Sequence, residues 1–259
     1  MEPTAIGRFF PVSVGIWGDA GKAATQLQNE LRNVHLNKEA KGWLESFLSK
    51  RRKFLEERDE KGSAGEVPIQ PPALYKALRE VLPRDAIITL DAGTMSLQAT
   101  DALNYFDPPS LITPLDFGLV GFSFAAGLGA KAARPDRPVV SLMGDGGFGM
   151  TMSELGTAIS SHLNTVSVVM NNHCWGVEKS YQRDFYDGRY IGADVYNPPY
   201  DRIAEAFGAR GFRVERPEEV CPAVESALNC GKPAVVDIQV DPNALYSFRQ
   251  DALKHRSKA

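Results

Sequence analysis

One acidic residue and one amide are spaced along this sequence as the ligands of a hard metal ion would be. Asp145 lies in a glycine-rich stretch, residues 144–149, that directly follows the apolar run 139–143. Asn172 follows a second apolar run, residues 166–170. Because Mg²⁺ takes oxygen ligands and is commonly held by one or two protein groups together with phosphate oxygens, these two side chains predict a site for Mg²⁺ and a phosphorylated ligand.

The glycines of the same stretch fit a diphosphate better than a dinucleotide. Gly146 and Gly147 let the backbone come close to a diphosphate and donate N–H groups to it. Gly144, Gly146 and Gly149 also satisfy the pattern G-x-G-x-x-G. However, the carboxylate of Asp145 would repel a pyrophosphate, and the next apolar run ends in asparagines instead of the acid that binds a ribose. A metal ion between carboxylate and phosphate removes both objections.

Helices and strands alternate regularly from Pro71 onward. Thr151 and Glu154 form an S-or-T-x-x-E pattern, which predicts that a helix begins near Met152. Strands that are apolar on both faces and separated by helices predict an α/β fold, a parallel sheet with helices on both faces, in which ligands bind beyond the carboxyl ends of the strands. We expect helices over 72–82, 96–104, 121–133, 152–162, 202–207 and 218–229, and strands over 86–90, 139–143, 166–170, 211–214 and 234–240.

The N-terminal third reads differently. Residues 9–17 predict a short strand, residues 20–31 a helix, and the charged segment 38–61 an amphipathic helix. One strand and one helix cannot bury a core alone, so we expect them to be the edge of something larger. The expected division is a strand-helix remnant of a larger domain (1–35), a charged helix and linker (36–66), the ligand-binding α/β domain (67–245) and a C-terminal tail (246–259).

Composition excludes several classes of protein. Hydrophobic residues make up 43% and charged residues 24% of the chain, and the formal net charge is −3. This balance gives no general attraction to nucleic acid or to an anionic membrane. No apolar run reaches the roughly 18 residues that cross a bilayer. The start of the chain lacks the features of a secretory signal, and three widely spaced cysteines form no disulfide framework, so we expect a cytoplasmic protein.

Several motifs together resemble one enzyme family. Gly-Asp-Gly at 144–146, a helix, and then Asn-Asn at 171–172 resemble the signature of thiamine-diphosphate enzymes. Asp91-Ala92-Gly93 and the segment 117–121, followed by a helix rich in small residues, resemble the acetolactate synthase branch of that family. This resemblance runs from about Ile6 to Leu253. Within the branch, residues 175–189 and 248–254 resemble the sulfoacetaldehyde acetyltransferases.

The resemblance implies a role for particular residues. Asp145, Asn172 and the backbone carbonyl of Cys174 would bind Mg²⁺, whereas the Cys174 thiol would be inert packing, since a thiol suits magnesium poorly. Val120, smaller than the family's usual residue, would be the wedge between the two rings of the coenzyme, and the Gly118 carbonyl would accept a hydrogen bond from its aminopyrimidine. The implied thiamine-diphosphate-binding set is Asp91, Gly93, Thr94, Gly118, Val120, Gly146, Gly147, Asn172, Trp175 and Gly176.

Substrate residues are less well indicated. Val177 and Tyr181 lie four apart on the helix expected after the glycine-rich loop, so one face of that helix would carry both toward the substrate. Lys179, Arg183 and Arg189 could meet an anionic substrate, although such residues are more often ordinary surface charges.

The resemblance also implies a missing part. Thiamine catalysis needs a glutamate against the pyrimidine ring, and in this family the glutamate comes from a separate pyrimidine-binding domain. Residues 1–66 are too few to form that domain, and Ile6 to Leu31 instead resemble the last strand and helix of the family's middle domain. We therefore expect a second subunit that carries it, in a heterotetramer or larger assembly acting on a 2-oxo acid or an aldehyde, with the chain's own catalytic residues unknown. The alternatives are a split 2-oxo acid decarboxylase of the sulfopyruvate or phosphonopyruvate type and a non-catalytic thiamine-diphosphate-binding subunit.

Overall fold

The computed structural model describes residues 3–35, 38–61, 65–114 and 117–246. The chain forms two units, residues 1–55 and 56–259. The first unit contains a short 3-10 helix (η1, Pro3–Ala5) and helix α1 (Ala20–Leu31), and helix α2 (Lys38–Lys61) continues from it into the second unit. Both predicted helices are therefore confirmed. The expected linker after α2 and the tail segment 248–254 fall largely outside the described residues, and the expected four-part division stays a prediction.

The strand predicted over residues 9–17 is not formed. These residues have no regular secondary structure, and Phe9 and Val14 are 79% and 78% exposed. The prediction was wrong because an extended apolar segment becomes a strand only when another strand satisfies its backbone N–H and C=O groups. Among the described residues, none pairs with this segment. Helix α1 likewise buries none of its residues, although its N-terminus is capped by Asp19, whose Oδ1 accepts a hydrogen bond of 2.9 Å from the Lys22 amide.

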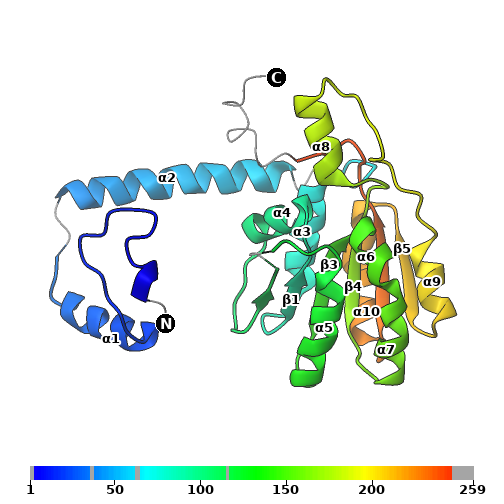
Figure 1. Ribbon diagram of the computed structural model, residues 1–259, viewed down its shortest axis with the longest axis horizontal. Helices are drawn as coiled ribbons and strands as arrows, with labels where there is room; N and C mark the ends of the chain where they lie inside the picture. The colour runs from blue at the N-terminus through cyan, green and yellow to red at the C-terminus, as the bar shows by residue number, and fades with distance from the viewer. Residues whose placement is uncertain (1–2, 36–37, 62–64, 115–116, 247–259) are drawn as a thin grey trace. The chain divides into compact units, whose positions relative to one another are not determined.

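The second unit is built on a six-stranded sheet in which every pair of neighbouring strands is parallel (Figure 1). The predicted α/β fold is thus confirmed. The spatial order is β2-β1-β3-β4-β6-β5, so the chain moves outward from β1 to β2 and then returns to β3. The strands are β1 (Ile87–Leu90), β2 (Leu111–Ile112), β3 (Val139–Gly144), β4 (Val166–Asn171), β5 (Arg210–Val214) and β6 (Ala234–Gln239).

Helices cover both faces of the sheet (Figure 1). Alternate strand residues point to opposite faces, so Leu142 and Val168 pack with α3 and α10, whereas Met143 and Val169 pack with α5, α7 and α9. On the first face lie α3 (Pro71–Val81), α4 (Thr94–Ala102) and α10 (Pro217–Asn229); on the second lie α5 (Phe122–Ala133), α6 (Asp145–Thr151), α7 (Leu155–Ser160) and α9 (Tyr200–Ala206).

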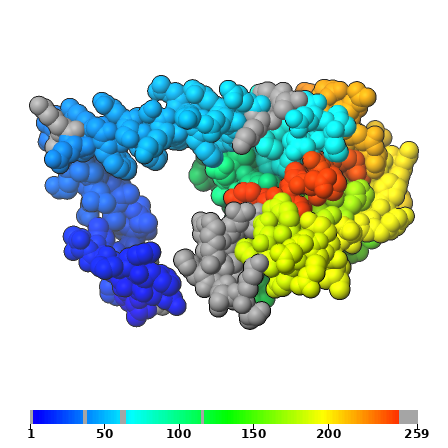
Figure 2. Space-filling model, turned by 90° about the horizontal axis from the view of Figure 1, so that it is seen from above, coloured from blue at the N-terminus to red at the C-terminus, as the bar shows by residue number. Residues whose placement is uncertain are grey.

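Helix α8 (Gly176–Phe185) and the long loop after it form part of the surface near the end of β6. In Figure 2 this yellow segment lies beside the red residues that follow β6. The Arg183 guanidinium donates a hydrogen bond of 3.3 Å to the carbonyl of Leu245, which agrees with this placement.

Within the described part of the chain, none of the helices has both the length and the apolar character needed to cross a membrane.

Candidate functional site

A cavity of about 520 Å³ lies at the carboxyl ends of β1, β3 and β4. Its volume is within the range of roughly 300–1,000 Å³ that is usual for small-molecule sites. The chain reverses its direction across the sheet between β1 and β3, and ligands of such folds bind at this reversal. The cavity is lined by almost every residue that the sequence predicted: Asp91, Gly93, Thr94, Gly118, Val120, Asp145, Gly146, Gly147, Asn172, Cys174, Trp175, Gly176 and Val177.

Asp145 begins a helix instead of preceding one by a turn. Helix α6 starts at Asp145, directly after β3, so the loop predicted ahead of Met152 is helical; the helix predicted over 152–162 is a 3-10 helix (η2, Met152–Glu154) followed by α7. The capping box is not formed either, because the Thr151 hydroxyl donates 3.1 Å back to the carbonyl of Gly147. Gly146 and Gly147 therefore lie in the first helical turn, where backbone N–H groups lack acceptors within the helix. This position suits donation to a phosphate better than the loop that we expected.

The carboxylate of Asp145 is almost fully buried, with 2% of the residue exposed. Its Oδ2 accepts a hydrogen bond of 2.6 Å from the Asn197 side-chain amide. Burial raises the pKa of Asp145 above its ordinary value of 3.8, and the hydrogen bond from Asn197 opposes that rise. A cation beside the carboxylate would favour its charged form. The group therefore fits a ligand of a divalent metal ion.

Asn172 faces the same cavity from the end of β4. Its Oδ1 accepts a hydrogen bond of 3.3 Å from the amide of Cys174, so the two residues form one tight turn. That turn is tied to the loop opposite, because Trp175 N–H donates 2.8 Å to the Ala193 carbonyl and Val195 N–H donates 2.8 Å to the His173 carbonyl. Backbone hydrogen bonds on either side of Cys174 thus fix the segment that would carry two of the predicted Mg²⁺ ligands.

The Cys174 side chain is buried and chemically quiet. Burial raises the pKa of its thiol to about 11, so the thiol keeps its proton at neutral pH. A protonated thiol is a poor metal ligand, which agrees with the expectation that only the backbone carbonyl of Cys174 serves the metal.

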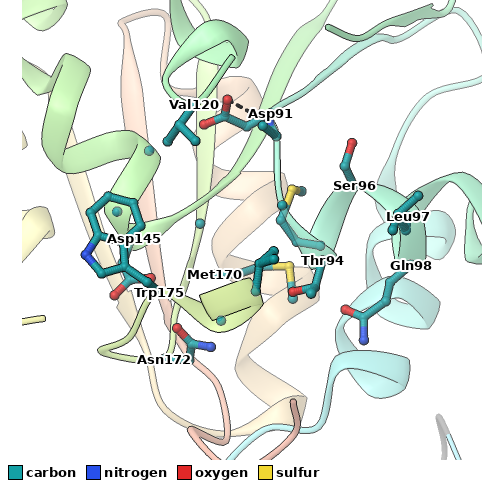
Figure 3. Close-up of a pocket in the computed structure, with 18 of the residues that line it drawn as sticks. Asp91, Thr94, Ser96, Leu97, Gln98, Val120, Asp145, Met170, Asn172 and Trp175 are labelled. Atoms are coloured by element: carbon teal, nitrogen blue, oxygen red, sulfur yellow. Dashed lines mark hydrogen bonds between the residues drawn. The ribbon is translucent and has the colours of Figure 1, made fainter. Parts of the chain in front are cut away.

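One aromatic neighbour, Trp175, and one acidic neighbour, Asp91, explain why residues 146 and 147 are glycines. A Cβ atom at Gly146 would overlap the indole ring of Trp175, and a Cβ atom at Gly147 would overlap the carboxylate of Asp91. Figure 3 shows Trp175 beside Asp145 on one side of the cavity, with Asn172 on the same side and Thr94 across from them. The ring and the backbone of the first turn therefore form one closely packed wall.

Asp91 organises the adjoining part of the cavity wall. Its Oδ2 accepts a hydrogen bond of 3.0 Å from Gly121 N–H, and its Oδ1 accepts hydrogen bonds from Phe122 N–H (3.0 Å) and Ala92 N–H (2.9 Å). Asp91 lines the cavity as expected, but its carboxylate is used to fix the start of α5. This arrangement holds the preceding loop, which carries Val120, over the cavity (Figure 3).

The two residues expected to contact substrate are not equivalent. Val177 lines the cavity, whereas Tyr181 does not. The ring of Tyr181 instead lies beside that of Phe185, with the ring centroids 6.1 Å apart. Nor do the cations near α8 line it: Lys179 pairs with Asp194 and Arg183 with Asp184, each at 2.7 Å. Each of these two cations is thus paired with a neighbouring carboxylate outside the cavity lining.

Sequence reasoning missed Asn197 and Tyr200. Asn197 lies in the loop between α8 and α9 and reaches Asp145, and the Tyr200 hydroxyl donates to the Asp145 carbonyl at 3.0 Å. Nothing in their spacing indicates this proximity, since the loop is long and irregular. In the described residues, no group of three His, Cys, Asp or Glu side chains is placed to hold a metal ion. A site at Asp145 would therefore depend on neutral oxygens and on the phosphates of its ligand.

Comparisons with known proteins agree with this cavity. Residues 91–238, more than half of the chain, match the family model described as "Thiamine pyrophosphate enzyme, C-terminal TPP binding domain". The sulfoacetaldehyde acetyltransferase of Alcaligenes xylosoxydans xylosoxydans is 30% identical over 97% of this chain and 46% of its own length. A probable acetolactate synthase large subunit of Methanococcus aeolicus is 29% identical over 96% of this chain and 43% of its own length.

A solved structure supports the same assignment. The thiamine diphosphate-dependent 4-hydroxybenzoylformate decarboxylase of Rhodococcus jostii RHA1 superposes with a TM-score of 0.64 and 27% identity, over 69% of this chain and 34% of that one. The chain spans less than half the length of the curated relatives named above. The matched family model begins directly after β1 and covers β3, β4 and all of α8. The chain therefore belongs to the thiamine pyrophosphate enzyme family, through its C-terminal cofactor-binding domain.

Proposed function

We propose that this chain is the diphosphate-binding subunit of a thiamine-diphosphate- and Mg²⁺-dependent enzyme made of two kinds of polypeptide. The enzyme would form an acyl-anion equivalent from a 2-oxo acid and transfer it to an acceptor, as a carbon–carbon lyase or ligase. One observation carries the proposal: a buried carboxylate, Asp145, and the amide of Asn172 line one cavity beside the glycines of a first helical turn.

The lining residues would share the work of binding. Asp145, Asn172 and the carbonyl of Cys174 would hold Mg²⁺, and the amides of Gly146 and Gly147 would donate to the diphosphate. Bound thiamine diphosphate supplies the carbon nucleophile that such reactions need. The hydrogen bonds of Asp91 to the start of α5 would keep Gly118 and Val120 in place against the rings of the coenzyme. Val177 would meet the substrate, while Tyr181, which does not line the cavity, would affect the substrate only indirectly.

Exposed apolar residues near the cavity support a partner subunit. Phe117 is 88% exposed and Leu119 51% exposed, and both flank Gly118 in the loop over the cavity. Apolar residues that gather on a surface commonly mark an interface. The glutamate that activates the coenzyme would come from the partner's pyrimidine-binding domain. We also propose a heterotetramer or larger assembly, a 2-oxo acid or aldehyde substrate, and a cytoplasmic location.

The partner is tested by assaying the purified chain with and without the other subunit. Given thiamine diphosphate and Mg²⁺, we expect the chain alone to be inactive toward 2-oxo acids and the pair to be active. Turnover by the chain alone at ordinary enzyme rates, about 1–10³ s⁻¹, would contradict the two-polypeptide proposal.

A second candidate is a 2-oxo acid decarboxylase divided in the same way. The decarboxylase structure that superposes on this chain favours it. Product analysis with and without an aldehyde or phosphate acceptor separates the two, because a transferase gives a new product only when the acceptor is present. A non-catalytic subunit is the third possibility. Loss of activity in an assembled Asp145→Ala variant would exclude it, and retained activity would favour it.

A further inference from the structure

Asn197 joins the ends of the two strands that carry the proposed metal ligands. Its Nδ2 donates a hydrogen bond of 2.6 Å to Oδ2 of Asp145, which directly follows β3. The same nitrogen donates 2.9 Å to Oδ1 of Asn171, the last residue of β4 and the neighbour of Asn172. One amide group therefore links the ends of two neighbouring strands on one side of the cavity.

The direction of these hydrogen bonds is fixed at both ends by carboxylates. An ionised carboxylate only accepts, so the nitrogen of Asn197 must face Asp145. At the other end, Asn171 Nδ2 donates 2.9 Å to Oδ1 of the fully buried Asp237, which leaves Oδ1 of Asn171 for Asn197. Neither amide can turn over without placing two acceptors, or two donors, against each other.

The oxygen of Asn197 is used as well. The Tyr200 hydroxyl lies 2.9 Å from Oδ1 of Asn197 and 3.0 Å from the backbone carbonyl of Asp145, and these two oxygens share its one hydrogen. Tyr200 is itself fixed, because the residue is 2% exposed and its ring packs edge-on against Phe148 with ring centroids 4.9 Å apart. Both hydrogens and the oxygen of one amide are therefore engaged. Serine offers one hydrogen and aspartate none, so neither can replace it.

We propose that Asn197 is a positioning residue for the metal site. By holding Oδ2 of Asp145, it leaves Oδ1 for the divalent cation, and through Asn171 it fixes the segment that presents Asn172. Groups that orient metal ligands in this way commonly change metal affinity by about 10- to 100-fold when they are removed. This inference rests on the proposed function, since it assumes a metal ion at Asp145.

The test compares two leucine substitutions. Asn197→Leu keeps the size of the side chain and removes its polar atoms. Asn164→Leu is the matched control, because Asn164 lies near the other end of β4 and also donates through Nδ2, at 3.0 Å to the Gly231 carbonyl. Calorimetry on the assembled protein measures the Mg²⁺ concentration needed for thiamine diphosphate binding. We expect Asn197→Leu to need about 10- to 100-fold more Mg²⁺ and Asn164→Leu to behave like the wild type.

Two results would overturn the inference separately from the proposed function. One is an Asn197→Leu protein with the wild-type Mg²⁺ requirement. The other comes from the ligand-free full chain: NMR should show slow hydrogen exchange of the Asn197 side-chain amide, and exchange as fast as that of the Asn229 side-chain amide near the end of α10 would contradict the network. If wild-type protein bound thiamine diphosphate without any need for Mg²⁺, the proposed function would fail first, and the role of Asn197 with it.

Discussion

Gly147 packs so closely against the carboxylate of Asp91 that a Cβ atom at position 147 would overlap Oδ2 of Asp91 and lie 3.2 Å from its Cγ. The two residues belong to different parts of the fold: Asp91 directly follows β1, and Gly147 lies in the first turn of α6. Because Asp91 also holds the amides of Gly121 and Phe122, this one approach sets how the loop over the cavity sits relative to the proposed diphosphate site.

Gly147→Ala should therefore be destabilising. The added methyl group would push Asp91 away from the start of α5, and overpacking of this kind costs about 1–3 kcal/mol. Gly129→Ala is the control: Gly129 lies on the exposed side of α5, and a methyl group added there would meet no atom within 4 Å, so alanine should stabilise the chain by about 0.5–1 kcal/mol. Urea unfolding of both variants measures the difference. If Gly147→Ala were as stable as Gly129→Ala, the Asp91 side chain would have to move aside without loss of stability, and the expected destabilisation would be wrong.

The stability of the chain should depend on pH through Asp91. Burial raises the pKa of Asp91 in the folded protein above its ordinary value of 3.8, although its backbone hydrogen bonds oppose the rise. A group of this kind contributes its stability below the unfolded pKa and loses that contribution as pH rises through the folded pKa.

Asp91→Asn removes this titration, so the free energy of unfolding of the wild type should fall more than that of the variant between pH 3.8 and neutral pH. Unfolding in urea at several pH values measures both. Parallel pH profiles would contradict the assigned pKa shift.

Binding of thiamine diphosphate should be visible in the fluorescence of Trp175. The indole ring lines the cavity and packs against Gly146, so a bound diphosphate and metal ion would change its surroundings. The chain has three tryptophans, and Trp17 and Trp43 are 68% and 69% exposed in other segments. We expect Trp175→Phe to abolish the fluorescence change, and Trp17→Phe and Trp43→Phe to retain it. A signal that survives in Trp175→Phe would place the ligand elsewhere.

Cys174 should be the slowest of the three cysteines to react with iodoacetamide. Its thiol is buried and its pKa is raised to about 11, and the thiolate is the reactive form. Cys221 and Cys230 are only partly buried. Mass spectrometry of timed labelling at about pH 8, close to the ordinary pKa of a free thiol, ranks the three sites, with labelling in urea as the control. Labelling of Cys174 at the rate of Cys230 would show that the turn after Asn172 opens readily.

The spacing of apolar residues, together with the glycines and prolines that end helices and strands, predicted most of the secondary structure of the second unit. The strands 86–90, 139–143 and 166–170 were found within a residue of their observed bounds, because continuous apolar runs between helices are typical of a buried parallel sheet. Strand β2, with two residues, was missed because so short a strand carries no pattern. The strand expected at 9–17 failed for the opposite reason, since its pattern is present but no described residue pairs with it.

The site residues that could be predicted are those that directly follow a strand. Asp145, Asn172 and the glycines between them follow strand ends, and parallel strands bring such ends together. Helix α6 was missed because Thr151 and Glu154 match the capping-box pattern, which placed the first helix after β3 at Met152, and the fold does not form that capping box. Asn197 was not predictable, since its role depends on where an irregular loop returns to the sheet. Local sequence patterns carry no information about such a return.

In the proposed function, Asp145 binds thiamine diphosphate through a divalent cation at the end of β3. Isothermal titration of thiamine diphosphate into the assembled protein, with Mg²⁺ and with a chelator, tests it directly in the wild type and in Asp145→Ala. The wild type should bind thiamine diphosphate only when Mg²⁺ is present, and the variant should not bind it. Equal binding by both proteins, or no binding by the wild type with Mg²⁺, would contradict it.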